Sequence, residues 1–141
     1  MSDCVVDTSV AVKWVLPEPD SADAVRVVAD VTTSGGRLRM LDLAVIEGAN
    51  VIWVRVHRQL ITPTQANTAL QLLQSTPVLL EPAHPFLPDA FALAVRFDIA
   101  VYDALFVAAV QHHNCDGVTA DEPLVRVIGA TFPSIKLLRN W

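Results

Sequence analysis

The chain is short of the residues from which several common functional sites are built. It has two cysteines, Cys4 and Cys115, each at the start of an apolar stretch, which suits buried reduced thiols and gives no disulfide framework. Its four histidines lack the spacing of a zinc site. Among the five glycines, Gly35 and Gly36 mark a turn and not a phosphate-binding loop. Disulfide scaffolds, zinc sites and glycine-loop nucleotide sites are therefore excluded.

Long apolar runs and an excess of basic residues are also missing. No apolar run approaches the roughly 18 residues of a membrane span. Asp3 stands where a secretory leader would be basic, so we expect a cytoplasmic location and no membrane partner. Lysine and arginine number 10 against 15 aspartates and glutamates, a net charge of −5. This balance argues against nonspecific nucleic-acid binding by a basic surface, but it is compatible with an enzyme whose acids are neutralised by metal ions.

Apolar side chains are what the sequence has in plenty. They make up 52% of the 141 residues, while charged residues make up 18%. Such a chain is too apolar for disorder, and its length suits one domain over residues 1–141. We expect a sheet that is covered on both faces, and further apolar surface that a partner protein covers.

Strand-like and helix-like segments alternate along the chain. A β-branched stretch that begins at Cys4 predicts a first central strand, which ends at Asp7. Further strands are predicted at 38–41, 78–80, 115–120 and 135–138. Helices are predicted at 10–16, from a cap at Asp20 or Ser21 to the break at 34–36, and at 43–57, 63–73, 88–97, 102–112 and 123–127. This alternation predicts an α/β fold, a single three-layer α/β/α domain with a mostly parallel central sheet of 4–5 strands.

Two aspartates follow predicted strands directly. Asp7 ends the first strand, and Asp121 follows Val118-Thr119-Ala120. Because ligand sites of open α/β sheets gather outside the carboxyl ends of the strands, both are site candidates. Each has an alternative role as the cap of the next helix, although Thr8 or Ser9 could take over that role from Asp7.

Two more acids lie on predicted helices among apolar neighbours. At helical spacing Glu47 meets four apolar residues and Asn50, which could orient its carboxylate. The segment 43–54 is apolar on nearly every side, which predicts a buried helix, where a carboxylate must be paired or bound to a metal. Asp103 likewise has only apolar neighbours at helical spacing. Its alternative is a place in the first turn of a helix, where the helix dipole favours a negative charge.

A cluster of carboxylates selects a hard cation, Mg²⁺ or Mn²⁺. Without the cation the acids would repel one another, and some would hold protons. A bound cation relieves this cost, lowers the pKa of a water molecule and so makes a nucleophile for phosphodiester hydrolysis. Asp7, Glu47, Asp103 and Asp121 are the expected ligands.

Four short motifs, in order and at this chain length, resemble those of the PIN-domain family and its VapC-type ribonuclease toxins. They are Val5-Val6-Asp7-Thr8-Ser9, Glu47 within 43–51, Tyr102-Asp103-Ala104, and Val118-Thr119-Ala120-Asp121. The resemblance implies a Mg²⁺- or Mn²⁺-dependent endoribonuclease whose acidic quartet is Asp7, Glu47, Asp103 and Asp121. It also implies an auxiliary role for the Ser9 hydroxyl. The position of Asp121 is the most variable of the four in the family.

The resemblance further implies partners. These are an RNA substrate, a second copy in a homodimer, and a protein antitoxin that blocks the acidic pocket in a heterotetramer or larger complex. Trp14 and Trp53 suit either partner contact or core packing, and Val15 and Leu16 could line an antitoxin groove. Three basic residues could meet RNA phosphates: Lys13, Arg55 and Arg58.

Two other functions remain open at this stage. One is a PIN-fold interaction module without activity, against which the full set of four acids argues. The other is a nuclease with the same site that acts in RNA processing, or on DNA, without a toxin role.

Overall fold

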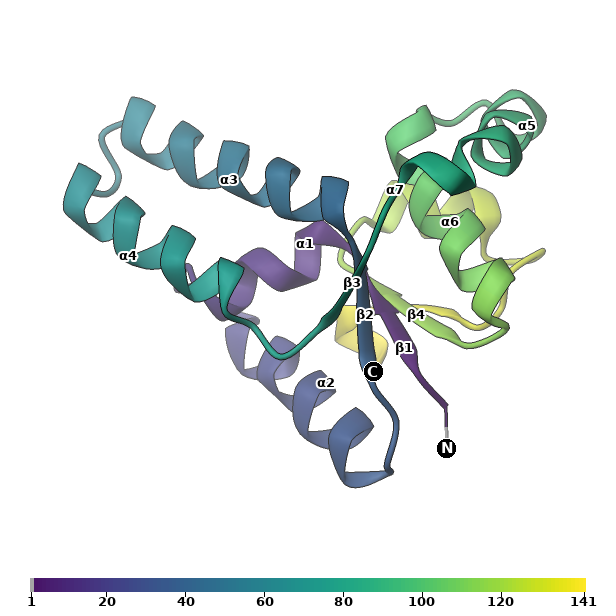
Figure 1. Cartoon of the computed structure of the whole chain (residues 1–141), viewed down its shortest axis with the longest axis horizontal. Coiled ribbons are helices and arrows are strands. Elements are labelled where there is room, and N and C mark those ends of the chain that lie inside the picture. The colour runs from purple at the N-terminus through teal and green to yellow at the C-terminus, as the bar shows by residue number, and fades with distance from the viewer. Residues whose placement is uncertain (1) are drawn as a thin grey trace.

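Five short strands form one parallel sheet in the order β3-β2-β1-β4-β5 (Figure 1). The computed structural model describes residues 2–141. The strands are β1 (Cys4–Val6), β2 (Leu38–Leu41), β3 (Leu79–Glu81), β4 (Asp116–Thr119) and β5 (Ile135–Leu137). All four neighbouring pairs are parallel, which confirms the predicted sheet.

Seven helices connect and cover the strands of residues 2–141. They are α1 (Thr8–Ala11), α2 (Ser21–Thr33), α3 (Asp42–His57), α4 (Pro63–Gln74), α5 (Leu87–Phe97), α6 (Val101–His113) and α7 (Glu122–Ile128). Three 3₁₀ turns, Val12–Trp14, His84–Phe86 and Leu138–Asn140, complete the fold. The first predicted helix is the least accurate, because it begins two residues early at Thr8 and changes to 3₁₀ geometry at Val12.

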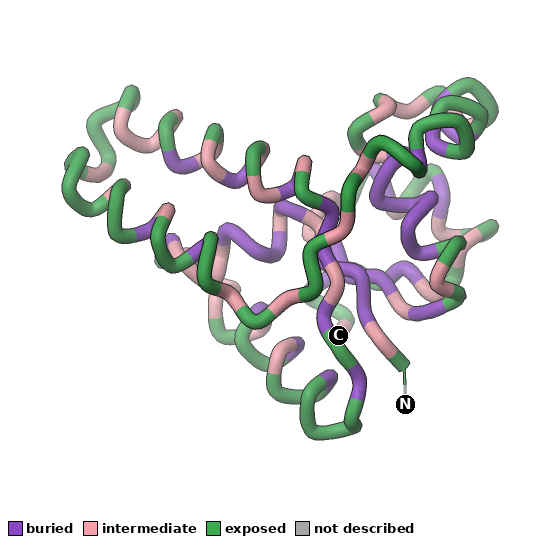
Figure 2. Tube along the Cα trace, viewed as in Figure 1, coloured by how far each residue is buried: buried purple, intermediate pink, exposed green. Residues whose placement is uncertain are grey.

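The two faces of the sheet bury different helices because strand side chains alternate between them. Val5 of β1 packs with residues of α5, α6 and α7. Its neighbours Cys4 and Val6 point the other way and pack with residues of α1, α2, α3 and α4. In Figure 2 the buried positions accordingly lie along the strands and on the inner sides of the helices. The fold is the predicted three-layer α/β/α arrangement.

The order in which strands are added to the sheet reverses at β1. Strands β2 and β3 are added on one side of it, and β4 and β5 on the other. The carboxyl ends of β1 and β4 therefore form the switch point of the sheet, where α/β proteins build their ligand sites. Asp7 follows β1 and Asp121 follows β4, so both lie at this switch point.

Helix α3 differs from its prediction. Only Ala44, Gly48 and Ile52 are buried, while the side chains of Ile46 and Trp53 are 66% and 57% exposed. The reason is visible in Figure 1, where α3 and α4 form an antiparallel pair that extends beyond the sheet and leaves its outer side uncovered. The expectation of a helix buried on nearly every side was wrong, because apolar composition does not guarantee a neighbour to pack against.

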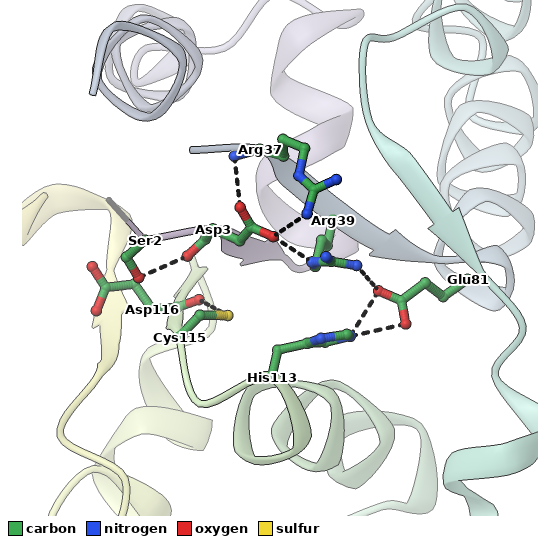
Figure 3. Close-up of polar contacts among 8 residues, drawn as sticks. All are labelled: Ser2, Asp3, Arg37, Arg39, Glu81, His113, Cys115 and Asp116. Carbon is green, nitrogen blue, oxygen red and sulfur yellow. Dashed lines mark hydrogen bonds and ion pairs between the residues drawn. The ribbon is translucent and has the colours of Figure 1, made fainter. Parts of the chain in front are cut away.

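An ion-pair network fastens β3 to the rest of the sheet (Figure 3). Arg39 of β2 donates hydrogen bonds to Asp3 (2.7 Å) and to Glu81 at the end of β3 (2.9 Å). His113 at the end of α6 contacts the same Glu81 carboxylate at 2.8 Å. Burial alone would raise the pKa of Glu81, but the hydrogen bonds from Arg39 and His113 lower it on balance. These four residues hold the sheet edge and lie apart from the switch point.

Two sequence expectations concern compartment. Both cysteines are free and buried, and burial raises the pKa of the Cys4 thiol, as inert thiols require. Across residues 2–141, the structure contains no helix with the length and apolar character needed to cross a membrane.

Candidate active site

Asp7 occupies the N-cap position of α1, yet its side chain makes no cap hydrogen bond. Its Oδ2 atom instead accepts two hydroxyl hydrogen bonds, from Ser9 Oγ and from Thr119 Oγ1, each at 2.8 Å. The two hydroxyls fix the plane of the carboxylate and leave Oδ1 outside this pair of bonds. The capping interpretation of Asp7 is therefore wrong, because its side chain makes no cap hydrogen bond and is bound by two hydroxyls.

The expectation that Thr8 or Ser9 caps α1 in its place is wrong as well. The Thr8 hydroxyl donates to the carbonyl oxygen of Ala44 at 3.1 Å, which joins α1 to the first turn of α3. Ser9 Oγ accepts from the backbone N–H of Ala120 at 2.9 Å while it donates to Asp7. Ser9 thus links the ends of β1 and β4, the position that suits its predicted auxiliary role.

Thr119 is a site residue that the sequence argument did not single out. It is fully buried at the end of β4 and donates to Asp7, and its hydroxyl also accepts from the backbone N–H of Asp121 at 3.1 Å. The signal in the sequence was a lone hydroxyl side chain at the end of a predicted strand, two residues before a candidate acid. Such a group needs partners when it is buried, and here the partners are two of the site acids.

Asp121 keeps the capping role that was left open for it. Its Oδ1 accepts from the backbone N–H of Leu124 at 3.1 Å, at the start of α7. Its charge nevertheless reaches the other acids, because it raises the pKa values of Asp7 and Asp103. Asp121 is thus a helix cap that faces the acidic site.

Glu47 and Asp103 are the acids that the two helical layers contribute near Asp7. Glu47 lies in the second turn of α3 and Asp103 in the first turn of α6, and both are half-buried. Burial is the main cause that raises the pKa of Glu47, followed by repulsion from Asp7 and Asp103. Burial, then Asp121 and Asp7, raises the pKa of Asp103. Asn50, which was expected to orient Glu47, is exposed.

The pKa of Asp7 is also raised, chiefly by burial, although the hydroxyls of Ser9 and Thr119 oppose the shift. In three carboxyl groups of the site, the ionised form is therefore not fully compensated by nearby positive charge or hydrogen bonds. A small cavity of about 10 Å³, roughly the room of one water molecule, lies between Asp7, Glu47 and an apolar wall that includes Leu105.

The donor set fits a hard divalent cation, since it consists of carboxylate and hydroxyl oxygens that repel one another. Within residues 2–141, however, no three His, Cys, Asp or Glu side chains are gathered closely enough to hold an ion as they stand. The acids would have to draw together around a cation. The assignment of Asp7, Glu47, Asp103 and Asp121 as its ligands remains a prediction.

Several residues expected to contact partners are engaged inside the protein. Lys13 pairs with Glu18 and, at 2.9 Å, with Asp20, and Arg55 pairs with the same Glu18. Leu16 is buried, so it does not line a surface groove. The Trp14 indole N–H donates to the carbonyl oxygen of Ala24 at 2.9 Å and packs against the core. The exposed Trp53 stacks on His57.

Comparisons of the sequence and of the structure with known proteins point to the same family. Residues 4–129 match the PIN domain family. The chain is 33% identical over 134 residues to Ribonuclease VapC3 of Pyrobaculum aerophilum, covering 93% of this chain and 95% of that protein. Among solved structures, PAE2754 from Pyrobaculum aerophilum superposes with a TM-score of 0.73 at 17% identity, covering 98% of this chain and 92% of that one. VapC20 of Mycobacterium tuberculosis, described as a sarcin-ricin loop cleaving toxin, superposes with a TM-score of 0.67 at 17% identity and covers 88% and 94% of the two chains.

These likenesses extend over almost the whole length of the chain, and they agree with its five-stranded parallel sheet. The chain belongs to the PIN-domain family, and within that family it resembles the VapC ribonucleases.

Proposed function

We propose that the protein is a Mg²⁺- or Mn²⁺-dependent endoribonuclease and the toxin of a toxin–antitoxin pair. One observation carries the nuclease assignment. Four acids from both helical layers and two strand ends surround the switch point of the sheet. Burial and the charge of Asp7 raise the pKa values of Glu47 and Asp103, and the charge of Asp121 adds to the raised pKa values of Asp103 and Asp7. A purely structural domain would gain nothing from this repulsion.

The toxin role is supported by relatives. The curated relative is named Ribonuclease VapC3, and a toxin–antitoxin complex from Klebsiella pneumoniae has a TM-score of 0.63 at 12% identity, covering 96% of this chain and 98% of that one. We infer that this chain likewise binds a protein antitoxin and forms a homodimer in the cytoplasm. Large apolar side chains that stay exposed on α3 and α5 offer surfaces for these contacts: Trp53, Phe91 and Val95.

In the proposed reaction Asp7, Glu47, Asp103 and Asp121 would hold the cation, with Asp7 at the centre. When bound, Mg²⁺ or Mn²⁺ supplies positive charge for the phosphate oxygens and lowers the pKa of the attacking water. Ser9 and Thr119 both donate to Asp7 Oδ2 and so hold the carboxylate in a fixed orientation. The apolar wall of the small cavity beside Asp7 and Glu47 excludes bulk water, which strengthens every charge interaction there.

Purified protein should cleave RNA with Mg²⁺ or Mn²⁺ and lose all activity with a chelator. Asp7→Asn and Asp103→Asn should each remove cleavage and relieve growth arrest on expression, with an unchanged circular dichroism spectrum. Asp89→Asn is the matched control, since Asp89 is an exposed carboxylate on α5. Full metal-dependent activity in Asp7→Asn would show that the site is wrong. A wild type that cleaves no RNA but binds its partner would favour the interaction module.

A further inference from the structure

A second, wider groove opens beside the acidic pocket. Its volume is about 480 Å³, within the range of small-ligand sites (roughly 300–1,000 Å³). It is lined by Thr8, Ile46, Glu47, Asn50, Val51 and Tyr102. Glu47 and Tyr102 also line the small cavity next to Asp7, so the groove continues the acidic pocket outward. It joins the two helical layers, because Ile46 belongs to α3 and Tyr102 to α6.

The most prominent side chains of this groove are apolar and exposed. Tyr102 is the only tyrosine of the chain and is 63% exposed, directly before the site residue Asp103. Ile46, across the groove, is 66% exposed. Asn50 is exposed as well and carries both a donor and an acceptor in its amide group. An aromatic face, an aliphatic face and an amide are the groups with which proteins hold an unpaired nucleobase.

Charge decides which part of an RNA fits here. The wall of this groove, as the structure describes it, contains Glu47 but no lysine or arginine. Two of the three predicted phosphate contacts, Lys13 and Arg55, are both paired with Glu18. Arg58 lies eleven residues beyond Glu47, ~16 Å further along the axis of a helix with a rise of 1.5 Å per residue. The groove wall therefore offers a phosphate no basic side chain, whereas its aromatic, aliphatic and amide groups suit a neutral base.

We propose that this groove is a nucleobase subsite, in which Tyr102 stacks on an unpaired base of the RNA next to the scissile phosphate. Ile46 supports the opposite face of the base, and the Asn50 amide reaches its edge. The inference rests on the proposed ribonuclease function and refines it. It makes single-stranded or looped RNA the preferred substrate, since a paired base is not available for such a stack.

Binding tests the subsite separately from cleavage. In the Asp7→Asn background, a single-stranded oligoribonucleotide with 2-aminopurine placed at each position in turn should lose fluorescence on binding at one position. Tyr102→Ala should remove that quenching and raise the Kd about tenfold, the loss that removing one base–aromatic stack brings. Tyr102→Phe should keep both, because stacking needs the ring and not the hydroxyl. Leu72→Ala is the matched control, since Leu72 is a large apolar side chain on α4 that is similarly exposed (51%) and lies outside the groove.

Kinetics of the active protein give the second measurement. Tyr102→Ala should raise KM about tenfold and leave kcat within about twofold, since the stack holds the substrate equally before and during the reaction. For wild type, an RNA with an abasic site at the position identified by quenching should also have a KM about tenfold higher. Tyr102→Ala acting on this abasic RNA should show no further rise in KM, because both changes remove the same stack.

Two results would overturn the subsite. One is unchanged quenching and KM in Tyr102→Ala. The other is unchanged RNA binding together with weaker self-association by analytical ultracentrifugation, which would assign the groove to a protein contact. Failure of the ribonuclease proposal looks different, because RNA would then bind in a Tyr102-dependent way without being cleaved by wild type.

Discussion

Replacing Glu47 by glutamine should stabilise the protein while it removes its activity. The Glu47 carboxylate is half-buried, and burial, Asp7 and Asp103 all raise its pKa above its ordinary value of 4.5. A raised carboxyl pKa means that the ionised group costs folding free energy at neutral pH. Glutamine has nearly the same shape and no charge, so it relieves that cost. No hydrogen bond from the described residues to the Glu47 side chain would be lost in the exchange.

The size of the gain follows from the exposure of the side chain. Replacing a destabilising residue of a functional site commonly raises the free energy of unfolding by ~0.5–2 kcal/mol. Because Glu47 is only half-buried, solvent screens its repulsion, and we expect the lower part of that range, ~0.5–1 kcal/mol. For a chain of 141 residues this corresponds to a rise in Tm of about 2–4 °C. RNA cleavage should fall about 100-fold, since a proposed cation ligand is lost.

The pH dependence of this gain has a definite sign. Between the unfolded pKa near 4.5 and the raised folded pKa, the folded protein binds more protons at Glu47 than the unfolded chain does. The stability of wild type therefore falls as pH rises through this window. Glu47→Gln has no such group. The Tm difference between the two proteins should be full at pH 7 and disappear below about pH 4.5.

Thermal unfolding by circular dichroism at pH 4 and pH 7 measures this difference directly. Glu122→Gln is not a suitable control because Glu122 is paired with Arg139, but Asp89→Asn removes an exposed charge outside the site. Added Mn²⁺ should raise the Tm of wild type more than that of Glu47→Gln. The argument from repulsion would be refuted if Glu47→Gln were less stable than wild type at pH 7. It would also be refuted if the gain in Tm over wild type were as large at pH 4 as at pH 7.

Three further predictions concern the residues around the site. Thr119→Val should lower stability by ~1–3 kcal/mol in denaturant unfolding and reduce cleavage, because Asp7 and the Asp121 N–H lose a buried partner, whereas Thr119→Ser should retain most of both. Gly117→Ala should cost ~1–3 kcal/mol in the same assay, since its methyl group would lie 2.6 Å from Val110 Cγ2 at the contact of β4 with α6; an unchanged midpoint would contradict this close approach. Lys13→Met should leave RNA affinity within about twofold by fluorescence anisotropy, because Lys13 is already paired with Glu18 and Asp20; a steep loss would show that it does contact phosphates.

The architecture was predictable because its signals are local. β-branched stretches alternate with helical periodicity, and the start of α4 is marked locally by Thr62 and Pro63, where Thr62 forms a capping box with Gln65. Asp7 and Asp121 were placed correctly at strand ends because an apolar run that stops at an acid marks the end of a strand. Glu47 and Asp103 were identified by apolar neighbours on their own helices.

What was missed depends on contacts between distant parts of the chain. The burial of α3 was overestimated because composition does not reveal that its outer side extends past the sheet. Lys13 and Arg55 looked free because 42 residues separate them in sequence, and only the folded chain brings both to the same partner, Glu18. Thr119 gained its role only when β4 paired with β1 and brought its hydroxyl to Asp7.

The most direct test of the acidic cation site is anomalous diffraction from crystals grown with Mn²⁺. At the manganese absorption edge, wild type should show a peak among the carboxylates of Asp7, Glu47 and Asp103, and Asp7→Asn should lose it. A manganese peak elsewhere, with none at these acids in wild type, would contradict the account.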